Sequence, residues 1–117
     1  MRVAIVGSRR YPELSRVEDY VRGLPAGSSL VTGSASGVDA TAARTARGRG
    51  LPVHVLGAGF DELHDRDRAA ARNRRLIGLA DVLVAFWDGR SEGTRSTIER
   101  ALDSGKEVHV FTPAARE

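Results

Sequence analysis

The residues Arg2-Val3-Ala4-Ile5-Val6-Gly7-Ser8-Arg9 decide the fold of this chain. After the first arginine the run is apolar and largely β-branched, which is typical of a strand buried on both faces of a sheet. Glycine, serine and arginine follow directly, and helix-like sequence begins near Pro12. A strand, a turn of small residues and a helix together expose backbone N–H groups and a helix N-terminus to an anion. These residues therefore predict a buried strand that ends in an anion-binding turn.

Two further segments repeat this order of strand, turn and helix. Residues 32–37 read Thr-Gly-Ser-Ala-Ser-Gly, and residues 88–94 read Asp-Gly-Arg-Ser-Glu-Gly-Thr. Each follows an apolar run and precedes a run with helical spacing. The carboxyl ends of parallel strands meet at one edge of a sheet, so we expect all three turns to lie together. The sequence thus predicts one place that binds phosphate or carboxylate.

Along the whole chain, five short apolar runs alternate with four runs of helical spacing. The expected strands cover residues 2–6, 29–32, 52–56, 81–87 and 107–111. The expected helices cover residues 12–24, about 38–47, 65 or 67 to about 79, and 92–104. This alternation predicts an α/β fold: a single Rossmann-like, doubly wound domain over residues 1–117, with a mainly parallel five-stranded sheet and helices on both faces. If the first strand is central, the turns after the first and fourth strands flank the ligand crevice.

Composition narrows the class of protein. The chain has 117 residues, 41% hydrophobic and 28% charged, which fits one globular domain. It has no cysteine, so disulfides and thiolate metal sites are excluded. No apolar run approaches the length of a membrane span, and the first residues lack the pattern of a signal peptide. We therefore expect a cytoplasmic protein without a membrane partner.

The basic residues are almost all arginine. The net charge is +3, and Lys106 is the only lysine. Guanidinium groups bind phosphate in a bidentate way, which favours an anionic partner. A charge of +3 is too small to indicate nucleic-acid binding by itself, and most surface arginines need no special explanation. The position of each arginine therefore matters more than the number.

The third expected helix carries polar residues where its apolar stripe should be. Asn73 falls on this stripe, and Arg72 lies at its margin. An inward polar group costs about 1–3 kcal/mol unless it finds a hydrogen-bond partner. Asn73 therefore either pins neighbouring backbone or contacts a ligand. For Arg72 we favour a role in the site over an ion pair with Asp39 or Asp88.

Other candidates come from the second and third turns. Asp39 falls in the first turn of a helix, where it would complement the helix dipole and orient the loop, or bind a sugar hydroxyl. Ser91 is a plausible helix cap, but capping does not require Gly93, which favours a binding role there. Trp87 is either a wall against a base or, more simply, a core residue. The predicted ligand- and phosphate-binding residues are Gly7, Ser8, Arg9, Thr32, Gly33, Ser34, Ala35, Gly37, Asp39, Arg72, Asn73, Asp88, Ser91, Glu92, Gly93 and Thr94.

Several chemistries have no support in the sequence. The turns match neither the Walker pattern nor the Gly-x-Gly-x-x-Gly dinucleotide pattern. His54, His64 and His109 lack ligand spacing, so no metal site is predicted. No serine or threonine has an evident histidine base. We expect no required cofactor, but a bound nucleotide that carries magnesium would be compatible with the crevice.

At these residues the chain resembles a known superfamily. The segment Ser34-Ala35-Ser36-Gly37-Val38-Asp39 and the segment Arg72-Asn73-Arg74 resemble motifs of DNA-processing protein A. With Gly7-Ser8-Arg9 they resemble the SLOG superfamily of Rossmann-like proteins, which also includes the LOG phosphoribohydrolases, and most of all its small stand-alone YspA-type members. The resemblance covers nearly the whole chain. It implies binding of a nucleotide or nucleotide derivative, or of single-stranded DNA, and a homodimer.

The hydrolase branch of that superfamily carries Pro-Gly-Gly-x-Gly-Thr-x-x-Glu before its last long helix. Here Gly93-Thr94 matches, but Thr97 stands at the glutamate position. A threonine cannot supply a carboxylate, so the resemblance implies binding more strongly than catalysis. An enzyme of this kind would be a nucleoside 5′-monophosphate phosphoribohydrolase that uses another carboxylate, such as Glu92 or Asp88.

Overall fold

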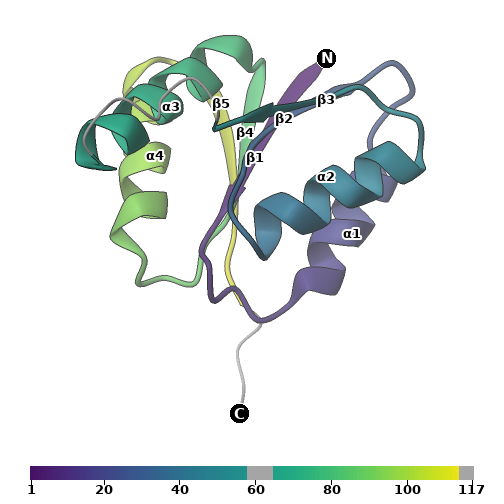
Figure 1. Cartoon of the computed structure of the whole chain (residues 1–117), viewed down its shortest axis with the longest axis horizontal. Coiled ribbons are helices and arrows are strands. Elements are labelled where there is room, and N and C mark those ends of the chain that lie inside the picture. Colours follow the sequence, from purple (N-terminus) through teal and green to yellow (C-terminus); the bar gives the residue numbers. More distant parts are fainter. Residues whose placement is uncertain (58–64, 114–117) are drawn as a thin grey trace.

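Parallel strands form one sheet in the order β3-β2-β1-β4-β5 (Figure 1). A computed structural model describes the backbone of residues 1–57 and 65–113, and the side chains of all of these except residues 65–70. Each neighbouring pair of strands is parallel. The strands are β1 (Arg2–Gly7), β2 (Ser29–Gly33), β3 (Val53–Leu56), β4 (Val82–Phe86) and β5 (Glu107–Phe111).

The most apolar runs of the sequence form the centre of the sheet. Residues 3–5 of β1 and the whole of β4 are buried. β3 and β5 lie at the two edges, where Val55 and Val110 stay 40% and 42% exposed. Each of these two strands also carries an exposed histidine, His54 or His109. Burial on both faces therefore distinguishes the central strands from the edge strands.

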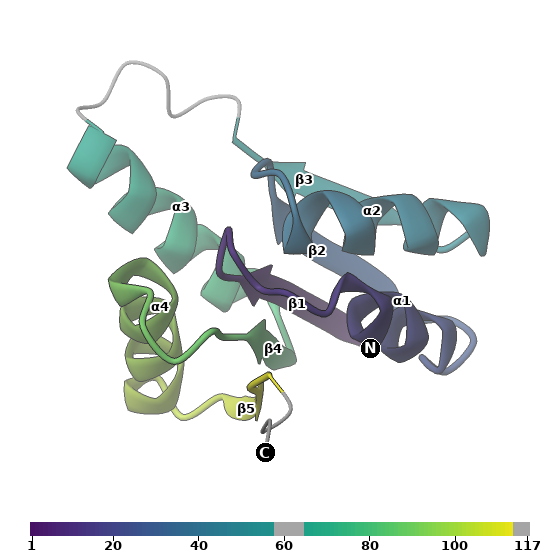
Figure 2. The same ribbon diagram turned by 90° about the horizontal axis from the view of Figure 1, so that it is seen from below.

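Helices cover both faces of the sheet. They are α1 (Leu14–Arg22), α2 (Val38–Gly48), α3 (Asp65–Leu79) and α4 (Glu92–Asp103). Figures 1 and 2 show α1 and α2 on one face, and α3 and α4 on the other. Side chains alternate between the two faces. Ile5 accordingly joins the core under α1 and α2, and Ala4 joins the core under α3 and α4.

The predicted α/β fold class is confirmed, with a sheet that is parallel throughout. β1 and β4 are neighbours although they are far apart in the sequence, so the strand order reverses between them. The first helix begins at Leu14 rather than Pro12, with Glu13 at its N-cap. The predicted caps of the third helix fall on side chains outside the described residues. None of the described helices is long and apolar enough to cross a bilayer.

Candidate functional site

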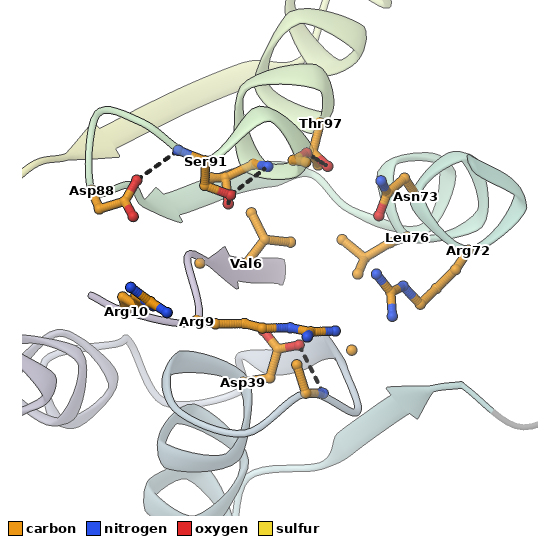
Figure 3. Close-up of a pocket in the computed structure, with 15 residues that line it drawn as sticks. Val6, Arg9, Arg10, Asp39, Arg72, Asn73, Leu76, Asp88, Ser91 and Thr97 are labelled. Carbon is orange, nitrogen blue, oxygen red and sulfur yellow. Dashed lines mark hydrogen bonds between the residues drawn. The ribbon is translucent and has the colours of Figure 1, made fainter. Parts of the chain in front are cut away.

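A pocket of about 400 Å³ opens where the strand order reverses, at the carboxyl edge of the sheet (Figure 3). The turns after β1, β2 and β4 form its walls together with α3 and α4. This volume is within the usual range for small-molecule sites. The lining residues are Val6, Gly7, Arg9, Arg10, Gly33, Ala35, Asp39, Arg72, Asn73, Leu76, Asp88, Ser91, Gly93, Thr94 and Thr97.

Most of the predicted site residues meet in this pocket, because parallel strands bring their following turns to one edge. Five predicted residues do not line it: Ser8, Thr32, Ser34, Gly37 and Glu92. Four lining residues were not predicted: Val6, Arg10, Leu76 and Thr97. Arg10 adjoins Arg9 in the first turn. Leu76 and Thr97 lie one helical turn after Asn73 and Gly93, so helical spacing could have found both.

Ser8 lies behind the pocket wall. Its side chain is 1% exposed. The hydroxyl accepts a hydrogen bond from the Asp88 amide at 3.1 Å and donates to the Thr94 hydroxyl at 3.3 Å. β1 and β4 are adjacent, so this hydroxyl reaches the turn after β4 instead of the ligand space. Ser8 links two turns of the site, in contrast to the predicted contact with ligand.

The other four predicted residues also serve elsewhere. The buried Thr32 hydroxyl donates to the Ile5 carbonyl at 2.7 Å, across the sheet. Ser34 packs against Gly57, where a Cβ would lie 2.5 Å from its Oγ. Gly37 has φ +79°, a conformation that favours glycine, so its role is to turn the chain into α2. Glu92, a carboxylate considered for hydrolysis, is exposed outside the pocket.

Some turn amides that we expected to face a ligand are bound within the protein. The Ala35 amide donates to Asp39 Oδ2 at 3.3 Å. The amides of Arg90 and Ser91 both donate to Asp88 Oδ1 at 2.8 Å. These two hydrogen bonds lower the pKa of Asp88, with that from Ser91 the larger cause. The first turn of α2 differs, since no described side chain caps its N-terminus.

Asp39 is a buried carboxylate on the wall of the pocket, 8% exposed. A Cβ added at Gly33 would lie 2.7 Å from Asp39 Oδ2 and 3.8 Å from the Arg72 guanidinium carbon. Gly33 is therefore needed to leave room for the carboxylate, a reason that the sequence did not reveal. Burial raises the pKa of Asp39, while the Ala35 hydrogen bond and then the charge of Arg72 oppose this.

The raised pKa of Asp39 predicts how stability depends on pH. Folding disfavours the ionised form of Asp39. This lowers the free energy of unfolding by its full amount at a pH above the folded pKa, and has no effect at a pH below the ordinary pKa of 3.8. We expect Asp39→Asn to raise the melting temperature at pH 7, and the gain to disappear as the pH falls below 3.8. Thermal unfolding followed by circular dichroism measures this. A difference that does not change with pH would contradict the assignment.

Three guanidinium groups line the pocket. Arg9 and Arg10 are exposed at the turn after β1, and Arg72 is half-buried on α3. Within the described part of the chain, none of the three forms a salt bridge or a side-chain hydrogen bond. Their charges oppose the carboxylates of Asp39 and Asp88. Among the described residues these cations have no ion-pair partner within 4.0 Å, although the charge of Arg72 acts on Asp39.

The α3 side of the pocket presents Arg72, Asn73 and Leu76, whose side chains point toward the ligand space in Figure 3. None of the hydrogen bonds among described residues involves the Asn73 side chain. That observation favours a ligand contact over a backbone pin. Opposite them, the Thr97 hydroxyl donates to the Gly93 carbonyl at 3.0 Å. Its proton is thereby engaged within α4.

Comparison with known proteins supports one kind of fold. No protein-family model and no curated protein matches the chain. The structure is similar to that of DNA processing protein A (DprA) from Streptococcus pneumoniae, with a TM-score of 0.80, 25% sequence identity and coverage of 99% of this chain. The chain has a DprA-like fold. It spans about half the length of that protein, 52%. The resemblance to the wider SLOG superfamily and its YspA-type members stays a prediction.

In this DprA-like domain, Trp87 supports the site from outside. Its indole N–H donates to the Ser91 carbonyl at 3.0 Å, and its side chain does not line the pocket. Trp87 therefore orders the turn after β4 and does not form a wall against a base. Among the described residues, no group of three or more His, Cys, Asp or Glu side chains is placed to hold a metal ion.

Proposed function

We propose that the pocket binds a nucleotide through its phosphate. The observation that carries this proposal is the approach of Arg9, Arg10 and Arg72 to one cavity from two elements. Guanidinium groups are suited to phosphate because they donate two parallel hydrogen bonds. The uncapped N-terminus of α2 adds the favourable end of a helix dipole.

The charge of the walls supports an anion despite the two carboxylates. Asp88 already accepts two backbone hydrogen bonds, which satisfy much of its acceptor capacity. The three arginines outnumber Asp39 and Asp88, so the walls carry one net positive charge. The volume of about 400 Å³ suits one nucleotide. No aromatic side chain is among the lining residues, so none is available to stack on a base. The proposed contacts are therefore with phosphate and sugar.

The test is a thermal-shift and calorimetric panel of nucleoside mono-, di- and triphosphates, with and without Mg²⁺. A ligand that binds only the folded state stabilises it, by about 2.7 kcal/mol when the ligand concentration is 100 times its Kd. The melting temperature rises as a result. Adenosine without phosphate is the matched control and is expected to give no shift. Equal shifts for adenosine and its phosphates, or no shift for any nucleotide, would overturn the proposal.

Single-stranded DNA is a second candidate, supported by the likeness to DNA processing protein A. The exposed Arg9 and Arg10 lie at the rim of the pocket, where a strand could continue past it. Against this, proteins that bind single strands usually stack bases on aromatic side chains. The chain has only 5% aromatic residues.

Salt dependence separates the two candidates. Binding of a strand releases about 0.7 counterions per phosphate contacted, so four contacts predict a loss of about 50-fold in affinity between 50 and 200 mM salt. We expect a fluorescent oligonucleotide to bind weakly and a mononucleotide to compete with it fully. Tight oligonucleotide binding with the steep slope, and no competition, would favour the DNA-binding function instead.

A further inference from the structure

We infer that Asp39 makes the pocket selective for a ligand whose sugar carries free hydroxyl groups, that is, for a ribonucleotide over its deoxy forms. This inference rests on the proposed nucleotide-binding function and names the ligand class more narrowly. It concerns the one carboxylate in the pocket that is both buried and incompletely bonded.

The geometry leaves half of this carboxylate unused. Oδ2 accepts the Ala35 amide at 3.3 Å and lies against Gly33. Thr32 lies close enough for its hydroxyl to lower the pKa of Asp39, but that hydroxyl donates its one proton to the Ile5 carbonyl at 2.7 Å. Among the described residues, no geometrically defined hydrogen bond reaches Oδ1. Asp39 lines the cavity, and Oδ1 is not among the fully buried side-chain atoms that lack a partner. An ionised carboxylate only accepts hydrogen bonds, so the ligand must supply a donor here.

The chemistry of that donor follows from the surrounding charges. A second phosphate beside Asp39 would meet a like charge in a partly dehydrated wall, which is unfavourable. A sugar hydroxyl donates without bringing negative charge, and its own oxygen can accept from a cation. Arg72 is that cation, since its guanidinium lies close enough to influence the ionisation of Asp39. A ligand that places its phosphate at the arginines and its sugar hydroxyls toward Asp39 therefore complements the charge on both sides of the pocket.

A purely structural role explains the arrangement less well. A helix-capping carboxylate would bond the free amides of α2, but the N-cap is Gly37, and no hydrogen bond among the described residues joins Asp39 to those amides. Asp39 bonds Ala35 instead, which precedes the helix, and does so with one oxygen. Asparagine in its place keeps an acceptor for the Ala35 amide and removes the charge. Asp39→Asn thus separates loop support from ligand selection.

The experiment measures calorimetric affinities for AMP, 2′-deoxy-AMP and 3′-deoxy-AMP. We expect the native protein to bind AMP at least about tenfold more tightly than at least one deoxy form, as befits one hydrogen bond to a charged acceptor. In Asp39→Asn this preference is expected to fall to about one, because the charged acceptor is lost. Asp103→Asn, at the exposed last residue of α4, is the matched control and should keep the preference.

The outcomes are distinct. Failure of all three nucleotides to bind the native protein would overturn the proposed function itself. Binding of AMP and both deoxy forms with equal affinity would leave that function standing and overturn the role of Asp39. A preference that persists in a folded Asp39→Asn protein would do the same. Because Asp39→Asn is expected to raise the melting temperature, failure of that variant to fold would also overturn the role given to Asp39.

Discussion

Arg72→Ala is expected to weaken nucleotide binding at least tenfold, about 1.4 kcal/mol, while the fold survives. Arg72 lies on the pocket wall and is half-buried on α3. It forms none of the salt bridges found in the described part of the chain, so removing its side chain leaves no described ion-pair partner without a counter-charge in direct contact. What the variant does lose is a cation that opposes the charge of Asp39. A phosphate would then approach Asp39 with less compensation, and its affinity should fall.

Isothermal titration with AMP measures this effect, and circular dichroism checks the fold. Arg75→Ala is the matched control because Arg75 is exposed on the same helix and does not line the pocket. We expect Arg75→Ala to bind as the native protein does. Unchanged affinity in Arg72→Ala, or an equal loss in both variants, would show that the guanidinium of Arg72 does not act as proposed.

Gly7→Ala is expected to lower the free energy of unfolding by about 2–3 kcal/mol, the upper part of the range for overpacking a filled core. A Cβ at Gly7 would lie 2.5 Å from both Cβ and Cγ2 of Val38, at the start of α2. Val38 is 1% exposed and β-branched, so it cannot rotate away. α2 would have to move away from β1, and the turns of the pocket would move with it. The melting temperature should fall by about 10 °C.

Two further variants establish the cause. Gly48→Ala, at the end of α2, is the matched control because a Cβ there meets nothing within 4 Å. It should be neutral or slightly stabilising, since alanine favours helix. In a double-mutant cycle, Val38→Ala should cost less in the Gly7→Ala background than alone, because it removes the contacts with Cγ1 and Cγ2 and leaves only that with Cβ. Additive effects would show that Gly7 is required for another reason.

The repeating pattern of strand, turn and helix predicted the architecture well, for a physical reason. A continuous apolar run such as residues 3–6 has no polar residue that could face water, so the sequence predicts burial on both faces. α2 and α4 begin at the predicted residues, Val38 and Glu92, because glycine or a capping serine precedes each. Right-handed crossovers then place every following turn at one edge.

Two serines in glycine-containing turns, Ser8 and Ser91, differ in role, and sequence patterns did not predict this difference. Ser8 is 1% exposed and joins two turns, whereas Ser91 lines the pocket and also caps α4. Both were predicted to contact the ligand. The difference arises because β1 lies beside β4, which places the Asp88 amide within reach of the Ser8 hydroxyl.

The order of elements, the parallel sheet and the edge at which the turns gather are thus already encoded in local sequence patterns, because backbone geometry and burial periodicity act over a few neighbouring residues. Which side chains enter the pocket depends instead on contacts between residues distant along the chain. Gly7 must be small because Val38 packs against it, and Arg72 comes from a separate helix to face Asp39. Such contacts exist only after the elements have packed, so no local pattern contains them.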